Sequence, residues 1–189
     1  MKGEWCYFSN RFTDSQCKSI ISEIKTRPAQ DATLGVDGER SDNSYRRSKI
    51  RFVQRNDLIL GWIFDEIWKM AIQANDEWFG FHLLKMDYIQ IAEYTGTDKG
   101  EYKTHHDVFY MNKTDYHRKL SAIIQLSDPT EYEGGDFQMY EIEQQPTAAA
   151  LKTQGTAIFF PSFIRHAALP VTNGTRYSIA AWIDGPRWR

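Results

Sequence analysis

Residues 155–183 read GTAIFFPSFIRHAALPVTNGTRYSIAAWI and contain two of the apolar, β-rich runs of this chain. The runs Ala157–Phe160 and Tyr177–Ile183 are rich in aromatic and β-branched residues, which is typical of strands. An Asn-Gly pair at 173–174 separates them, and such a pair is typical of a tight turn between strands. This stretch therefore predicts antiparallel β structure.

Similar short runs recur from residue 84 onward, and turn-forming residues separate them. The other candidate strands in this half are Leu84–Glu93, Val108–Tyr110, Leu120–Leu126, Phe137–Tyr140 and Ala148–Lys152. Many short strands at this spacing predict a β-sandwich or barrel.

The first half of the chain predicts helices instead. A helix capped by Thr13 or Asp14 carries apolar residues at helical spacing and ends before Pro28. A second amphipathic helix is expected after Asn56 or Asp57. Between them we expect a loop over 29–44 and a strand at Lys49–Gln54. The predicted fold class is α+β and mainly β, with the N-terminal helices packed on one sheet.

The predicted organisation is a single domain over residues 1–189. Residues 1–83 form a mostly helical support region, and residues 84–185 form the β core. At 189 residues the chain has the size of one domain.

The net charge of −2 disfavours a broad nucleic-acid footprint, and the two cysteines form no zinc or disulfide pattern. Without a signal-peptide run or a membrane span, the chain is expected to be cytoplasmic.

A candidate metal site lies in the stretch YKTHHDVFYM, residues 102–111. On an extended chain, residues two apart point to the same face, so His105 and Asp107 can converge on one ion. The intervening His106 must then point the other way. We therefore predict that His105, and not His106, pairs with Asp107.

A third ligand has to come from elsewhere in the chain, and the candidates are His82, His117 and His166. His166 is favoured because it follows a strongly apolar run and can begin a strand at the mouth of a barrel. Two histidines and one carboxylate form the facial triad of non-haem iron, which leaves coordination positions open.

Arg176 lies ten residues after His166, beyond the Asn-Gly turn. Its guanidinium can hold a carboxylate through two parallel hydrogen bonds. A metal with open positions and a nearby arginine fits a diacid with one chelating end, and 2-oxoglutarate is such a molecule.

Three segments resemble the Fe(II)/2-oxoglutarate-dependent oxygenases, specifically their prolyl 4-hydroxylase-like branch. They are EYTGTDKGEYKTHHD (93–107), KLSAIIQLSDPTEYEGGDFQMY (119–140) and the opening stretch, 155–183. They occur in the family's order. The resemblance implies a double-stranded β-helix, or jelly roll, with the metal at its mouth. It also implies Fe(II), 2-oxoglutarate and dioxygen as cofactor and cosubstrates, with ascorbate as a candidate reductant.

The resemblance also implies residue roles. It implies catalytic iron bound by His105, Asp107 and His166, and a 2-oxoglutarate carboxylate bound by Arg176. Further candidate contacts to 2-oxoglutarate are Tyr94, Trp182 and Gln125, the last at a position where several relatives carry tyrosine. The stretch NSYRRSKIRFV (43–53) resembles a segment of small bacterial and viral hydroxylases. It makes Arg46 and Arg47 candidate substrate contacts, together with Tyr102.

The function that follows is hydroxylation of an unactivated C–H bond, with prolyl 4-hydroxylation of a peptide or protein as the leading substrate hypothesis. Succinate and CO2 are the expected coproducts.

One alternative is an oxygenase acting on a small molecule or nucleic acid. Nucleobase demethylases typically carry a second arginine where this chain has Trp182, which disfavours the nucleic-acid reading. Another alternative is a metal-binding jelly roll without redox chemistry. The oligomeric state is left undefined, and no membrane association is expected.

Overall fold

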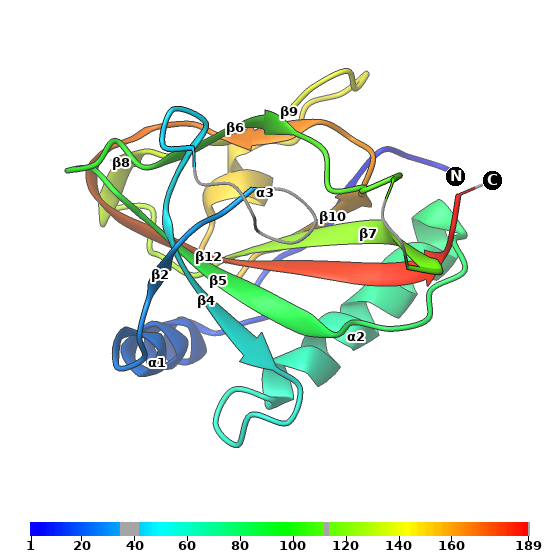
Figure 1. Ribbon diagram of the computed structural model, residues 1–189, viewed down its shortest axis with the longest axis horizontal. Helices are drawn as coiled ribbons and strands as arrows, with labels where there is room; N and C mark the ends of the chain where they lie inside the picture. Colours follow the sequence, from blue (N-terminus) through cyan, green and yellow to red (C-terminus); the bar gives the residue numbers. More distant parts are fainter. Residues whose placement is uncertain (35–41, 112–113, 189) are drawn as a thin grey trace.

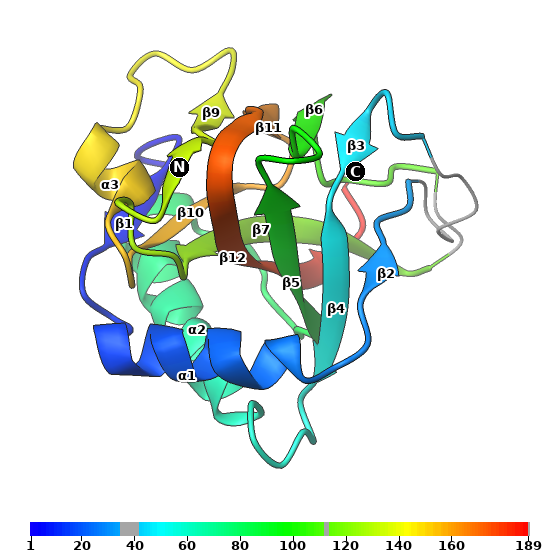
Figure 2. The ribbon, with the colours of Figure 1, turned by 90° about the vertical axis from the view of Figure 1, so that its left-hand side faces the viewer.

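Two antiparallel β-sheets face one another in the computed structural model, which describes residues 1–34, 42–111 and 114–188. Figure 1 shows the smaller sheet above the larger one, with helices α1 and α2 beneath the larger sheet. Figure 2 shows the same layers from the side. Among the described residues, no helix is long and apolar enough to cross a membrane.

The larger sheet has eight strands. In spatial order they are β1 (Cys6–Phe8), β10 (Ala157–Pro161), β7 (Tyr116–Gln125), β12 (Val171–Pro186), β5 (Tyr88–Thr95), β4 (Lys49–Gln54) and β2 (Gln30–Asp31), while β8 (Tyr132–Gly134) pairs with β12. The smaller sheet has four strands, in the order β3 (Arg46–Arg47), β6 (Glu101–His105), β11 (His166–Ala168) and β9 (Phe137–Met139). This mainly-β, antiparallel arrangement confirms the predicted fold class.

Helix α1 (Asp14–Lys25) begins where the sequence predicted. Thr13 Oγ accepts a hydrogen bond from Gln16 N, and the Gln16 side chain accepts one from Thr13 N, which forms a capping box. The buried face of α1 carries Cys17, Ile20 and Ile24 and packs into the main hydrophobic core.

The main core lies between the helices and one face of the larger sheet. Helix α2 (Trp62–Ala74), which continues into a π-helical turn, η1 (Asn75–Phe79), contributes a buried stripe. Strand β12 divides its side chains between two environments, as alternation along a strand requires. Tyr177, Ile179, Ala181 and Ile183 join the core, whereas Arg176, Ser178, Ala180 and Trp182 line a cavity on the other face. Strand β12 thus contributes to the hydrophobic core with one face and to the cavity with the other.

Some predicted elements are wrong. Ala148–Lys152 is a short helix, α3, and not a strand, because Thr147 caps it and its alanines favour helix. Val108–Tyr110 forms no strand. The second helix begins later than expected, at Trp62, because the Asp57 carboxylate accepts hydrogen bonds from Ile59 N and Leu60 N and holds a turn ahead of it.

The region 1–83 is less helical than predicted, since strands β1, β2, β3 and β4 all lie in it. The predicted loop at 29–44 contains the short strand β2. Residues 35–41 of that loop lie outside the described part of the chain.

Asp57 is also the partner of a partly buried ion pair with Arg27, which adds a charged link between the C-terminal end of α1 and the β4–α2 connection. The hydrogen bond from Arg27, helped by the two backbone N–H groups, holds the pKa of Asp57 below its usual range although burial opposes this. A depressed carboxyl pKa stabilises the folded state above the unfolded-state pKa of about 4, and this contribution is lost as the pH falls through the folded-state pKa.

Asp57→Asn is therefore expected to lower the free energy of unfolding at pH 7 by about 1–3 kcal/mol. Urea denaturation of both proteins at pH 7 and pH 3 checks this. The difference between them should shrink at pH 3. A difference that is equally large at both pH values would contradict the electrostatic assignment.

Candidate active site

Three side chains that can bind a metal meet at one end of the smaller sheet. The ligand atoms of His105, Asp107 and His166 all lie within 4.8 Å of one another. His105 Nε2 is 3.7 Å from Asp107 Oδ1, and His166 Nε2 is 3.6 Å from Asp107 Oδ2. The two histidines face each other in register across β6 and β11. His166 begins β11, as predicted, so strand pairing alone brings the two rings together.

Both histidines are held in the tautomer that a metal needs. His105 Nδ1 lies 2.8 Å from Lys103 O, and His166 Nδ1 lies 3.0 Å from Ile164 O. A ring nitrogen next to a carbonyl oxygen must carry the hydrogen, which leaves Nε2 with its lone pair. Burial, reinforced by the proximity of His166, lowers the pKa of His105 to about 3. His105 is therefore neutral at physiological pH, as a metal ligand must be.

Asp107 reaches the cluster in a different way from the one expected. Strand β6 ends at His105, so Asp107 is not held by the strand ladder. Its backbone N–H donates to Ser162 O at 2.8 Å, and its Oδ2 accepts a hydrogen bond from Ser121 Oγ at 2.7 Å. Burial works against ionisation, yet the nearby histidines and Arg118 lower the pKa of Asp107 to about 2. The cluster therefore combines two imidazoles with one carboxylate, a donor set that suits iron.

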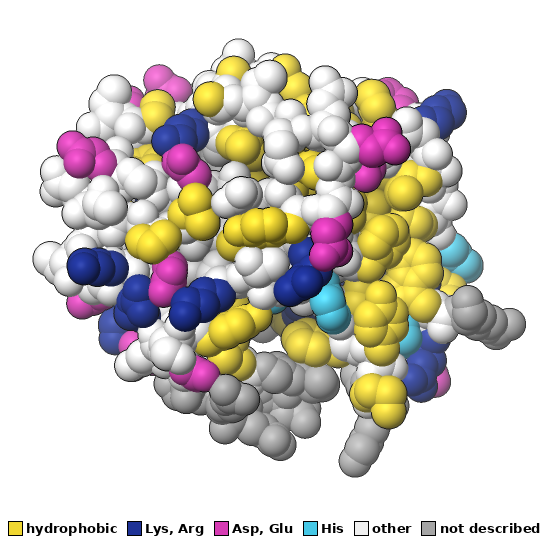
Figure 3. All heavy atoms as spheres, turned by 90° about the horizontal axis from the view of Figure 1, so that it is seen from above, with side chains coloured by type: hydrophobic (Ala, Val, Ile, Leu, Met, Phe, Trp, Pro, Cys, Tyr) yellow, Lys and Arg dark blue, Asp and Glu magenta, His cyan; other side chains and the backbone are white. Residues whose placement is uncertain are grey.

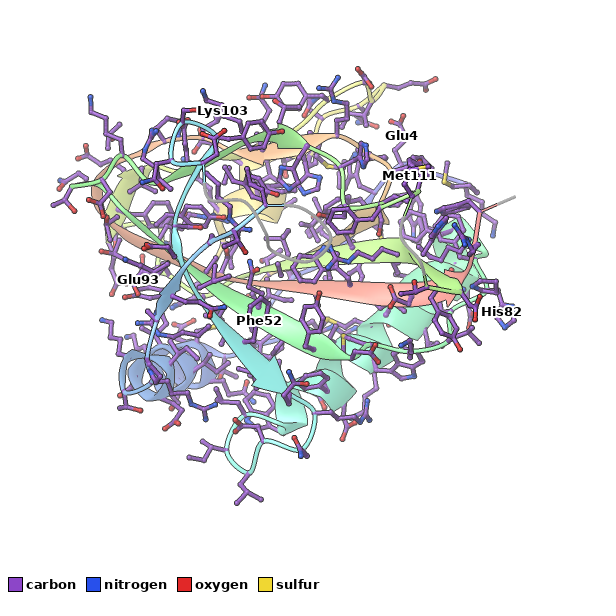
Figure 4. All side chains as sticks on the ribbon, viewed as in Figure 1. Glu4, Phe52, His82, Glu93, Lys103 and Met111 are labelled. Carbon is purple, nitrogen blue, oxygen red and sulfur yellow. The ribbon has the colours of Figure 1, made fainter. Side chains whose placement is uncertain are left out.

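The other candidate ligands lie outside the cluster, although His106 lines the same cavity. His82 lies at the far edge of the molecule in Figure 4. His117 Nδ1 accepts a hydrogen bond from Trp188 N at 3.0 Å. His106 is exposed, and its ring contacts Tyr110 at a centroid distance of 5.8 Å. None of the three belongs to the group of converging ligand atoms found among the described residues.

His106→Ala is expected to leave metal affinity within about twofold of the parental value, because the exposed His106 ring offers no ligand atom to the cluster and its substitution should change folding stability by no more than ~0.5 kcal/mol. His105→Ala should lose most of its affinity. Titration of each apoprotein with Co(II) in a calorimeter compares them. The reverse result, with metal lost in His106→Ala and retained in His105→Ala, would invert the assignment.

A cavity of about 1410 Å³ opens between the two sheets, and the three ligands line it. Arg176, which is 2% exposed, also lines it. Arg176 Nε and Nη2 donate to Gln125 Oε1 at 3.2 and 2.8 Å. The amide nitrogen of Gln125 is buried and has no hydrogen-bond partner among the described residues. Tyr94 is the cross-strand neighbour of Arg176, with its ring centre 5.6 Å from Arg176 Cζ.

This end of the cavity fits a carboxylate. A buried cation and an unsatisfied buried amide N–H group are both donors, and an unsatisfied buried donor costs free energy until an acceptor arrives. The structure therefore brings together Arg176, Gln125 and Tyr94, which the family resemblance marks as candidate contacts to 2-oxoglutarate, and those contacts stay a prediction. Trp182 lines the same cavity but packs against Arg118 and Tyr88.

Arg118 is a cavity residue that sequence reasoning missed. Its guanidinium lies 3.9 Å from the centre of the Trp182 ring, and its Nη2 donates to Tyr88 Oη at 2.8 Å. Alternation from the core residue Leu120 would place Arg118 in the core. The pairing of β7 with β12 shifts between Ile183 and Asp184, so the alternation is interrupted there. The sequence carries no signal for that bulge.

The candidate substrate residues separate into two environments. Arg46 is buried and lines the cavity, with its guanidinium 4.3 Å from the centre of the Tyr102 ring. Tyr102 in turn stacks on His105 at a centroid distance of 3.5 Å. Arg47 instead donates to backbone carbonyls and to Glu101 on the neighbouring strand β6, and it does not line the cavity. These contacts hold Arg47 against β6 and outside the cavity that Arg46 lines, and its assignment as a substrate contact stays a prediction.

Two facing antiparallel sheets with a two-histidine, one-carboxylate cluster in the cavity between them define a jelly-roll metal centre. The family model described as the 2OG-Fe(II) oxygenase superfamily matches residues 89–184. The chain belongs to this superfamily, whose members are enzymes that use Fe(II), 2-oxoglutarate and dioxygen. This confirms the family resemblance and the expected cofactor and cosubstrates.

Comparison with individual proteins agrees with this. A PKHD-type hydroxylase from Prochlorococcus marinus is 36% identical over 191 residues, covering 94% of this chain and 77% of that protein. Shorter matches to other PKHD-type hydroxylases span only 34–39% of those proteins' lengths.

Two solved structures share the fold. A prolyl-4-hydroxylase from Pseudomonas putida superposes with a TM-score of 0.72 at 18% identity, covering 96% of this chain and 92% of the other. A Trichoplax adhaerens prolyl hydroxylase, solved with a hypoxia-inducible-factor peptide fragment, gives 0.74 at 15% identity, covering 96% and 83%.

Proposed function

We propose that this protein is a Fe(II)- and 2-oxoglutarate-dependent dioxygenase that hydroxylates a prolyl residue of a peptide or protein at C4, with release of succinate and CO2. One observation carries the proposal. A two-histidine, one-carboxylate cluster and a buried arginine with an unsatisfied amide beside it line or adjoin a single cavity.

His105, Asp107 and His166 would hold the iron. Three protein ligands leave coordination positions open for a chelating cosubstrate and dioxygen. When bound, the iron with 2-oxoglutarate and dioxygen supplies the oxidant for an unactivated C–H bond. The protein's own part is to orient both imidazoles, to keep His105 neutral and to keep Asp107 ionised.

Arg176 and Gln125 would hold the far carboxylate of 2-oxoglutarate. In the structure Arg176 uses Nε and Nη2 on the neutral oxygen of Gln125. A carboxylate is a stronger acceptor for a guanidinium than an amide oxygen, and it also offers an acceptor to the free Gln125 N–H group. Tyr94 closes this end from the adjacent strand β5.

A peptide substrate is supported by the remaining part of the cavity. Phe52, Tyr88 and Trp182 line it with aromatic surface, and Phe52 lies on β4 near the centre of the view in Figure 4. The exposed Tyr110 and Met111 directly follow Phe109, a cavity-lining residue. Figure 3 views the molecule from above, and apolar side chains gather on one side of the face that it shows. Such surface suits an extended apolar chain segment more than a polar small molecule. The names of the similar proteins point to prolyl substrates as well.

The test has two stages. Anaerobic titration should first show that 2-oxoglutarate binds only when Fe(II) is present. Succinate release is then measured with a panel of proline-containing peptides, with free proline, and with matched peptides in which alanine replaces the proline.

The expected result is succinate release coupled to addition of one oxygen atom to a proline-containing peptide, detected by mass spectrometry. Coupled turnover with free proline alone would shift the substrate to a small molecule. Binding of metal without any 2-oxoglutarate turnover would support a non-redox metal-binding module instead.

A further inference from the structure

A chain of buried hydroxyl groups lies behind the candidate metal ligand Asp107. Ser121 on β7 and Ser162, which directly follows β10, are both fully buried. Ser121 Oγ lies 2.7 Å from Asp107 Oδ2 and 2.9 Å from Ser162 Oγ. Strands β7 and β10 are neighbours in the larger sheet, so Ser121 and Ser162 both belong to that side of the cavity, whereas Asp107 follows a strand of the smaller sheet.

The direction of these hydrogen bonds follows from proton counting. An ionised carboxylate only accepts, so the single hydroxyl proton of Ser121 goes to Asp107 Oδ2. Ser121 then has no proton left for Ser162, and the Ser162 hydroxyl must donate to Ser121 Oγ. Each hydroxyl thus polarises the next toward the carboxylate.

Ser162 also holds the backbone of Asp107. Its carbonyl oxygen accepts from Asp107 N at 2.8 Å, and its own N–H donates to Lys119 O at 3.0 Å. Asp107 is thereby tied to the larger sheet through both its backbone and its side chain. This matters because β6 ends at His105 and gives Asp107 no strand partner.

We propose that Ser121, supported by Ser162, is a positioning residue for the metal centre. The hydrogen bond from the Ser121 hydroxyl to Oδ2 fixes the orientation of the Asp107 carboxylate. Oδ1 then remains available as the oxygen that binds the metal. Asp107 Oδ1 accepts no hydrogen bond from the described residues, and it lies on the His105 side of the cluster. The inference rests on the proposed metal-binding role of the three ligands.

The test is binding of Co(II) alone to the apoprotein, measured by calorimetry without 2-oxoglutarate or substrate. Ser121→Ala is expected to weaken Co(II) binding by about 10–100-fold, the usual effect of losing a group that orients a metal ligand. Ser162→Ala removes only the supporting hydrogen bond, so its effect should be smaller. Ser121→Cys keeps the side-chain size but is a weak donor, and it should resemble Ser121→Ala.

Ser127→Ala is the matched control. Ser127 is also buried on the larger-sheet side, and its hydroxyl accepts from Tyr177 N at 2.7 Å, with no contact to the ligands. It should lower thermal stability as much as the other serine variants while leaving Co(II) affinity unchanged. If the role of Ser121 were purely structural, Ser121→Ala would likewise lower thermal stability and leave Co(II) affinity unchanged.

Parental Co(II) affinity in both folded Ser121 variants would overturn the proposal. If the parental protein binds Co(II) but never turns over 2-oxoglutarate, the proposed function fails while the positioning role can still be measured. If the parental protein binds no Co(II), both fail together.

Discussion

Asp107→Ala is expected to reduce 2-oxoglutarate turnover by at least about 10³-fold. The substitution removes the only carboxylate of the cluster and leaves the two imidazoles as its remaining ligands. Without the negative charge, both metal affinity and the arrangement of open positions are lost. Succinate release under saturating Fe(II) and 2-oxoglutarate measures the effect.

Two controls accompany this variant. Asp87→Ala removes an exposed carboxylate paired with Lys85 and should retain parental turnover. Thermal unfolding should show that Asp107→Ala is still folded. Parental turnover in a folded Asp107→Ala protein would exclude the three-residue metal site.

Arg176→Lys is expected to raise the KM for 2-oxoglutarate by about 10–100-fold, with kcat changed much less. A hydrogen bond to a charged group contributes roughly 1.5–3 kcal/mol, and about 1.4 kcal/mol corresponds to a factor of ten. Lysine keeps the charge but loses the planar fork that holds two carboxylate oxygens. Steady-state kinetics with varied 2-oxoglutarate separates the two constants.

Gln125→Leu is the companion to this variant. It removes the unsatisfied N–H group and the Oε1 acceptor of Arg176 at nearly constant size, but it leaves the guanidinium in place, so it should raise the KM for 2-oxoglutarate less than Arg176→Lys does. An unchanged KM in Arg176→Lys would show that the cosubstrate carboxylate lies elsewhere. A lowered kcat with a parental KM would point instead to a role in the chemical step.

The metal cluster could be predicted because its information is local. Spacing by two residues and a histidine after an apolar run are visible in the sequence, and the structure brings His105, Asp107 and His166 together. The reasoning was only partly right for Asp107. Continued strand alternation was expected to align it with His105, but β6 stops at His105 and two distant serines place the carboxylate.

The missed features depend on contacts between distant segments. Ser121, Ser162 and Arg118 carry no motif. Ser121 and Arg118 acquire their positions from strand pairing across the larger sheet, and Ser162, just beyond β10, from the hydrogen bond that its N–H donates to Lys119 O. The β7–β12 bulge moves Arg118 into the cavity against simple alternation. The helix at Ala148–Lys152 was missed for a local reason, since an alanine run after a capping threonine favours helix and was assigned to a strand.

The two anchor points of Asp107 have a mechanical consequence. His105 and His166 belong to the smaller sheet, while Asp107 is fastened to the larger one through Ser121 and Ser162. An ion bound by all three residues would link the two sheets at the cavity mouth and would restrict their motion relative to each other. Metal addition should therefore slow amide hydrogen exchange in β6 and β11 and also at the end of β10, whereas α1, on the opposite side of the larger sheet, should exchange at its metal-free rate.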